Sequence, residues 1–98
     1  MTTVFKALSD DTRRQILKLL ADGDMTAKDI SEHFTISRPA ISKHLDILKE
    51  ANLVTSERTG MSVTYSLNAS VLQTTLGAFL GYFDHAMPAK EGDGNEMV

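Results

Sequence analysis

The chain has 98 residues, a length for which one domain is expected. It contains no cysteine, which excludes disulfides, thiolate metal sites and thiol redox sensing. The net charge is −3, and residues 1–83 carry equal numbers of acidic and basic groups, so no overall positive field attracts nucleic acid. Binding to DNA would therefore require a local basic patch.

The sequence shows no recognisable targeting or membrane-spanning segment. Its N-terminus lacks a basic region followed by an apolar run, which argues against a secretory signal. The longest strongly apolar stretch, residues 76–83, is far shorter than the ~20 residues that a membrane-spanning helix needs. We therefore expect a cytoplasmic protein without membrane insertion.

Two helices are predicted at the start of the chain. Residues 2–8 place apolar side chains at helical spacing, and residues 9–11 supply N-cap candidates for a second helix. That helix is predicted to run from residue 11 to about residue 20. Its apolar stripe leaves three basic side chains outside: Arg13, Arg14 and Lys18.

A third helix is predicted to begin at Thr26. Thr26 with Asp29 three residues later is a variant of the capping box, in which side chains satisfy the free N–H groups of a helix start. Ile30 and Phe34 are expected on the inner face of this helix. Residues 35–36 then form a short turn.

The fourth predicted helix presents two contrasting faces. Ser37 is the expected N-cap, and Pro39 falls in the first turn, where its missing N–H costs little. The core face repeats at i, i+4 and i+7 and consists of Ile41, Leu45 and Leu48. The first two turns expose, on the other side, Arg38, Pro39, Ser42 and Lys43.

This exposed face suits the major groove of DNA. Arg and Lys donate to guanine O6 and N7, and Ser pairs with several base edges or with phosphate. His44 flanks the buried stripe and is expected either to pack or to contact phosphate. An ordinary solvated helix face is the alternative interpretation, because Ser and Pro near a helix start are already explained by capping.

After residue 52 the hydrophobic period changes from helical to alternating. Residues 53–58 and 62–67 are predicted strands, joined by a three-residue loop, 59–61, that contains Gly60. Arg58 on this hairpin is able to reach phosphate or the minor groove. The whole pattern predicts a winged helix-turn-helix with these DNA-contacting candidates: Thr26, Ser37, Arg38, Pro39, Ser42, Lys43, His44 and Arg58.

A last helix is predicted over residues 68–87, and it is apolar around most of its circumference. Gly77 and Gly81 lie on one face, where they either let a second helix approach closely or make room for bulky aromatic neighbours. Pro88 ends the helix. We expect residues 1–87 to form one winged helix DNA-binding and dimerisation domain, and residues 88–98 to be a disordered acidic tail.

Two stretches carry a resemblance to a known family. SRPAISKHLDILKEANLVTSERTGMSVTYSL, residues 37–67, resembles the winged helix of the ArsR family of bacterial repressors, and FKALSDDTRRQILKLL, residues 5–20, resembles its entry helices. The resemblance covers about residues 3–87. Within the family, the chain most resembles the SdpR-like autorepressors, which also lack cysteine. It implies a mainly α fold with a small β-hairpin, ordered as four helices, two strands and a last helix.

The resemblance also implies function. Family members are homodimers that bind inverted-repeat operators in double-stranded DNA, with contacts at the positions of Ser37, Arg38, Pro39, Ser42 and Lys43. Arg38 replaces a common Gln and Pro39 a common Ser, so the base preference is expected to differ. The first and last helices form the dimer interface, where we expect Val4, Phe5, Leu8, Leu72, Leu76, Phe79, Leu80 and Phe83.

We predict no metal sensing. The three histidines are far apart in sequence, and Asp29 with His33 is one pair, which is too few ligands for a tight site. Zinc sensors of the family carry Asp and His early in the last helix, where this chain has Ala69 and Val71; of the late ligands only His85 is present. The arsenic-type cysteine cluster is absent.

An enzyme is not expected, because no triad, metal cluster or phosphate-binding Gly loop is recognisable, and no cofactor is expected. One alternative is a winged-helix protein-interaction module with little DNA affinity. Another is a repressor released by an unknown small ligand. A membrane protein that sequesters the repressor is a further expected partner.

Overall fold

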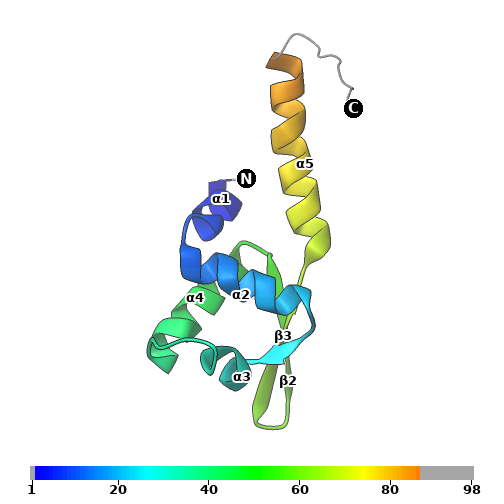
Figure 1. Ribbon diagram of the computed structural model, residues 1–98. Coiled ribbons are helices and arrows are strands. Elements are labelled where there is room, and N and C mark those ends of the chain that lie inside the picture. The colour runs from blue at the N-terminus through cyan, green and yellow to red at the C-terminus, as the bar shows by residue number, and fades with distance from the viewer. Residues whose placement is uncertain (1, 87–98) are drawn as a thin grey trace.

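The computed structural model describes residues 2–86, with side chains for residues 3–83. Its elements are α1 (Thr2–Leu8), α2 (Asp11–Ala21), β1 (Met25–Thr26), α3 (Ala27–Ser31), α4 (Arg38–Glu50), β2 (Val54–Thr59), β3 (Ser62–Leu67) and α5 (Ala69–Ala86). Helices α1–α4 and the β2–β3 hairpin gather together, whereas α5 projects away from the hairpin tip (Figure 1). The expected tail at residues 88–98 lies outside the described residues.

One core holds the helices together. Its buried members come from α1 to α4, from the connection after α4 and from the start of β2. The predicted core face of α4 is confirmed, because Ile41, Leu45 and Leu48 are buried. Val71 and Leu72 at the start of α5 are partly buried against this core. No helix in residues 2–86 is long and apolar enough to cross a membrane.

Both ends of α4 are fixed by local hydrogen bonds. Ser37 is the N-cap, as predicted, and its Oγ accepts from the Ala40 N–H at 3.3 Å. At the other end Asn52 adopts a left-handed φ of 61°. The Asn52 N–H donates to the Lys49 carbonyl at 2.9 Å and the Leu53 N–H to the Leu48 carbonyl at 3.0 Å. This Schellman motif satisfies the last carbonyls and sets where β2 begins.

The sheet differs from the sequence prediction in two respects. A two-residue strand, β1, pairs with β3 through Met25 with Tyr65 and Thr26 with Thr64, so the sheet has three strands in the order β1-β3-β2. The predicted three-residue loop is wrong, because Thr59 pairs with Ser62 and leaves a two-residue loop. Its first residue, Gly60, has a φ of 62°, which matches the preference of tight hairpin turns for Gly.

The third helix is shorter than predicted. It ends at Ser31, and the chain continues through bonds from His33 N–H to the Ile30 carbonyl and from Phe34 N–H to the Ser31 carbonyl. These i to i−3 bonds tighten the last turn. Phe34 therefore lies beyond the helix, although it still packs against the core as the sequence indicated.

Arg13 is buried, whereas the sequence pattern predicted it on the exposed face of α2. Its Nε donates to the Ala7 carbonyl at 2.8 Å and its Nη2 to the Lys6 carbonyl at 3.0 Å. The last carbonyls of a helix have no partner within that helix, so a guanidinium that faces them satisfies both. Arg13 thereby holds the C-terminus of α1 against α2.

Candidate DNA-binding face

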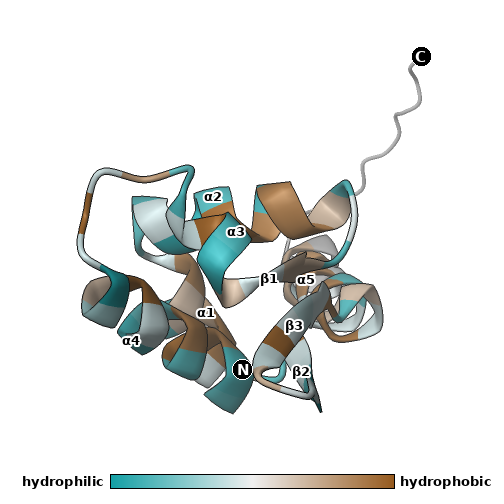
Figure 2. Ribbon diagram, turned by 90° about the horizontal axis from the view of Figure 1, so that it is seen from below, coloured by the Kyte–Doolittle hydropathy of each residue, from teal (hydrophilic) through white to brown (hydrophobic). Residues whose placement is uncertain are grey.

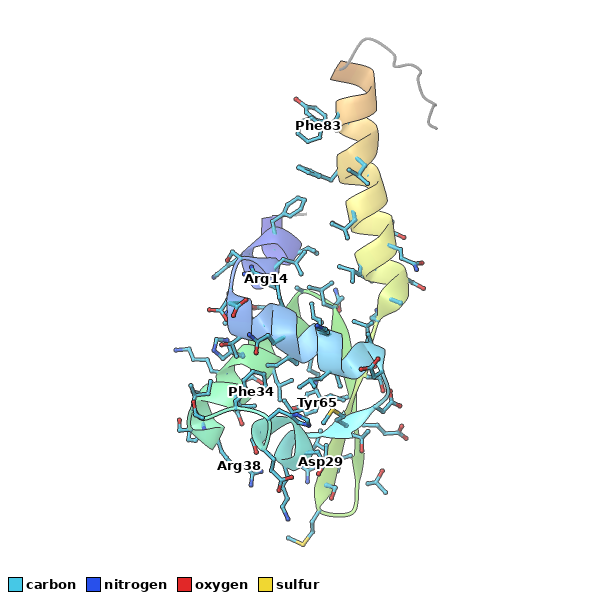
Figure 3. The ribbon with its side chains drawn as sticks, viewed as in Figure 1. Arg14, Asp29, Phe34, Arg38, Tyr65 and Phe83 are labelled. Atoms are coloured by element: carbon cyan, nitrogen blue, oxygen red, sulfur yellow. The ribbon has the colours of Figure 1, made fainter. Side chains whose placement is uncertain are left out.

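The start of α4 forms an exposed polar face. Ser37, Arg38, Pro39, Ser42 and Lys43 are all exposed, as predicted, because the buried stripe of the helix turns them outward. Figure 2 views the molecule from the hairpin end, and α3, α4 and the hairpin lie on this side. Figure 3 places Arg38 at the same end, far from Phe83 on α5.

The wing and the start of α3 flank this face. Arg58 is exposed near the hairpin tip, where it pairs with Val63. Thr26 is the N-cap of α3, as predicted, and its Oγ1 accepts from the Asp29 N–H at 3.1 Å. Both residues are thus available beside α4, on elements that the core holds in place.

His44 has a different environment from the other candidates. Its Nδ1 lies 3.2 Å from Arg13 Nη1 and 3.8 Å from Asp10 Oδ2, in a cluster that joins α4 to the start of α2. The Arg13 N–H donates to Asp10 Oδ2, which lowers the pKa of the Asp10 carboxyl, and the charges of His44 and Arg13 add to this effect. His44 thus helps to position α4 and, being only partly exposed, is not part of the exposed face at the start of this helix.

Tyr65 of β3 is partly buried against the core. Burial raises the pKa of its phenol, and the negative charge of Asp46 adds to the shift. Tyr65 is therefore neutral under ordinary conditions and belongs to the scaffold that supports α4.

A groove of about 300 Å³ separates the start of α4 from the wing. It is lined by Thr26, Lys28, Arg38, Met61, Ser62 and Val63. Neither Lys28 nor Met61 stands out by its spacing in the sequence. Only the tertiary structure brings them beside Arg38.

A second exposed surface lies on α5. Leu76, Phe79, Leu80, Tyr82 and Phe83 are large apolar residues that remain exposed. Phe79 stacks edge-on with Phe5 at a ring separation of 5.0 Å and with Phe83 at 4.9 Å. The Phe5–Phe79 pair joins α1 to α5, whereas the Phe79–Phe83 pair lies within α5. The exposed members of this set form an apolar surface on α5.

This surface is narrower than the predicted interface. Val4 is only 6% exposed and belongs to the core, and Leu8 and Leu72 are partly buried against that core. The sequence pattern did not reveal this burial within the chain. Of the other predicted interface residues, Phe5 is half-buried and four are exposed, and their place in an interface stays a prediction: Leu76, Phe79, Leu80 and Phe83.

The two glycines of α5 face open space. A Cβ atom built at Gly77 or Gly81 meets nothing within 4 Å. The suggestion that they make room for aromatic side chains within the subunit is therefore wrong. Close approach by a second helix remains a prediction.

The potential metal ligands are scattered over the part of the chain that the structure describes. There, no group of three or more His, Asp or Glu side chains is arranged to hold an ion. His33 lies past the end of α3, so the predicted helix-face pair with Asp29 does not form on one helix. The side chain of His85 lies outside the described residues.

Fold and surface together define a winged helix-turn-helix protein. The model of the bacterial regulatory protein arsR family matches residues 10–56. The chain is 54% identical to the transcriptional repressor SdpR of Bacillus subtilis over 86% of this chain and 93% of that protein. This chain belongs to the ArsR family of bacterial regulatory proteins, which are DNA-binding transcriptional regulators.

Solved structures agree. A crystal structure of an ArsR family transcriptional regulator superimposes with a TM-score of 0.84 at 24% identity, over 91% of this chain and 97% of that chain, which shows the shared fold. The homodimeric winged helix-turn-helix DNA-binding domain of a possible ArsR-family regulator from Mycobacterium bovis has a TM-score of 0.69 at 26% identity. That match covers 94% of this chain and 86% of the other.

Proposed function

We propose that this protein is a cytoplasmic, homodimeric autorepressor that binds an inverted-repeat operator without catalysis or a cofactor. The observation that carries the proposal is the exposed, basic start of α4. Within residues 3–83 neither Arg38 nor Lys43 forms an ion pair, so both are free to meet DNA. Two such helices in a two-fold dimer would lie ~34 Å apart, one helical turn of DNA.

Replacement of Lys43 by Ala is expected to weaken operator binding by ~1–3 kcal/mol and to relax specificity at one base pair, because a donor to a base edge is lost. The measurement is a titration against DNA from upstream of the protein's own gene and against single-base variants of the protected site. The charge-matched control is Lys49→Ala, since Lys49 is exposed but lies in the last turn of α4.

Equal losses for Lys43→Ala and Lys49→Ala would contradict a base contact at Lys43. The alternative, an interaction module without DNA affinity, is tested on the wild-type protein. If its binding to duplex DNA at low salt shows no salt dependence, the repressor proposal fails, because phosphate contacts always release counterions.

The release signal is proposed to be a sequestering partner protein in the membrane rather than a metal. The basis is the donor set, because the chain has no cysteine and the two histidines have different neighbours: His33 lines a groove with Gln15 and Lys18, whereas His44 lies beside Arg13. Release by a small apolar ligand is the second candidate, favoured by a groove of about 440 Å³ beside Phe5, Phe79 and Tyr82.

Zinc is accordingly expected to leave operator affinity unchanged. We also expect this protein to bind zinc more weakly than dedicated zinc sensors do. Isothermal titration with zinc and operator titrations with and without a chelator make the measurement. A tight complex of one zinc per subunit that releases the operator would overturn this prediction. Full release of the operator by a metabolite alone, in purified protein, would instead contradict the proposed membrane partner.

A further inference from the structure

The groove between α4 and the wing is suited to more than a base contact. Arg38 on one wall belongs to the first turn of α4, and Met61 and Ser62 on the other belong to the hairpin tip. If α4 lies in the major groove, the wing lies over the adjacent minor groove. The sugar–phosphate strand that divides the two DNA grooves must then pass between them.

The lining residues match the chemistry of that strand. Lys28 and Arg38 supply positive charge, whereas the neighbouring Asp29 is not part of the lining. The Thr26 hydroxyl already accepts the Asp29 N–H, which leaves its own proton free to donate to a phosphate oxygen. Met61, which is 99% exposed, and Val63 offer apolar contacts to deoxyribose.

We infer that this groove seats the DNA strand between the major and the minor groove, with Lys28 as the residue that binds its phosphate. The inference rests on the proposed function and adds a contact that the helix pattern does not reveal. Lys28 then contributes to the affinity for DNA and to the position of the protein along the duplex, but not to base recognition, because a phosphate contact carries no direct base information.

The test compares Lys28→Gln with wild type on the operator across a salt series. Each phosphate contact contributes about 0.9 to the slope of log affinity against log salt, so two lost contacts per dimer lower the slope by about 1.8. Between 50 and 200 mM salt the difference amounts to roughly tenfold in affinity. The loss is the same for operator and for unrelated duplex, which a change in base reading would not produce.

Lys18→Gln is the matched control. It removes the same charge from an exposed position that lines a different groove, beside Gln15 and His33. Lys28→Arg keeps the charge and is expected to retain most of the slope. A scan of neutral methylphosphonates through the operator locates the contact, since wild type loses affinity at one phosphate per half-site to which Lys28→Gln is indifferent.

Two results would count against the inference in different ways. If wild type binds the operator with salt-dependent affinity but Lys28→Gln matches Lys18→Gln, the strand does not use Lys28 and the proposed repressor stands. If wild type binds no duplex, the proposed function fails and the groove assignment fails with it.

Discussion

Replacing Arg13 by Met is expected to lower the free energy of unfolding by roughly 2–4 kcal/mol. Arg13 is 9% exposed, and its guanidinium donates to the carbonyls of Lys6 and Ala7 at the end of α1. Met fills a similar volume but donates nothing, so the buried Ala7 carbonyl loses the Arg13 Nε donor, and the Lys6 carbonyl is left with its bonds from Ser9 alone. The measurement is urea unfolding, read as a lower midpoint at an unchanged slope.

Arg14→Met is the control. The Arg14 side chain is 51% exposed, and its Nη1 donates to the Leu8 carbonyl at 2.6 Å, where water is able to replace it. We expect a loss of at most about 0.5 kcal/mol there. Equal losses for the two substitutions would show that Arg13 contributes no more than a surface arginine, contrary to the contacts described above.

The second large effect is expected on assembly. Leu80→Glu should weaken the dimer by roughly 100-fold, about 2.8 kcal/mol, because burial of an unpaired carboxylate at an interface is costly. Leu80 is 61% exposed within one subunit, so the fold of the subunit does not depend on it. Sedimentation equilibrium measures the dimer, and operator titration measures the accompanying loss of DNA affinity.

Thr74→Glu provides the matched control on the same helix. Thr74 is exposed, and helical spacing of 100° per residue places it on the opposite side of α5 from Leu76 and Phe83. It should leave the dimer intact. A dimer that tolerates Leu80→Glu but not Thr74→Glu would move the interface to the face that carries Gly77 and Gly81.

The elements that could be predicted are those with local causes. The two faces of α4 follow from a 3.6-residue period, and Ser37 and Thr26 cap helices through bonds that span three residues. The alternation of residues 62–67 marked a strand for the same reason. In each case the physical signal lies within one turn of helix or one strand, so the sequence carries it complete.

The features that escaped prediction depend on partners distant in the chain. Strand β1 exists because Met25 meets Tyr65, forty residues away in number. A pattern also cannot tell whether apolar Val4 is buried in its own subunit or by a second one, since burial looks alike in sequence. The structure resolves this for Val4, whose side chain lies in the core.

The sequence by itself determined the class of the protein: a winged helix-turn-helix with a basic, exposed start to α4, set by periodicity and capping. Tertiary structure alone decided the role of Arg13, which the helix pattern placed outside, because its acceptors lie on α1 and its third contact is His44 on α4. It also decided that Lys28 and Met61 share a groove with Arg38. Side chains from separate elements meet only once the core has fixed the angles between those elements.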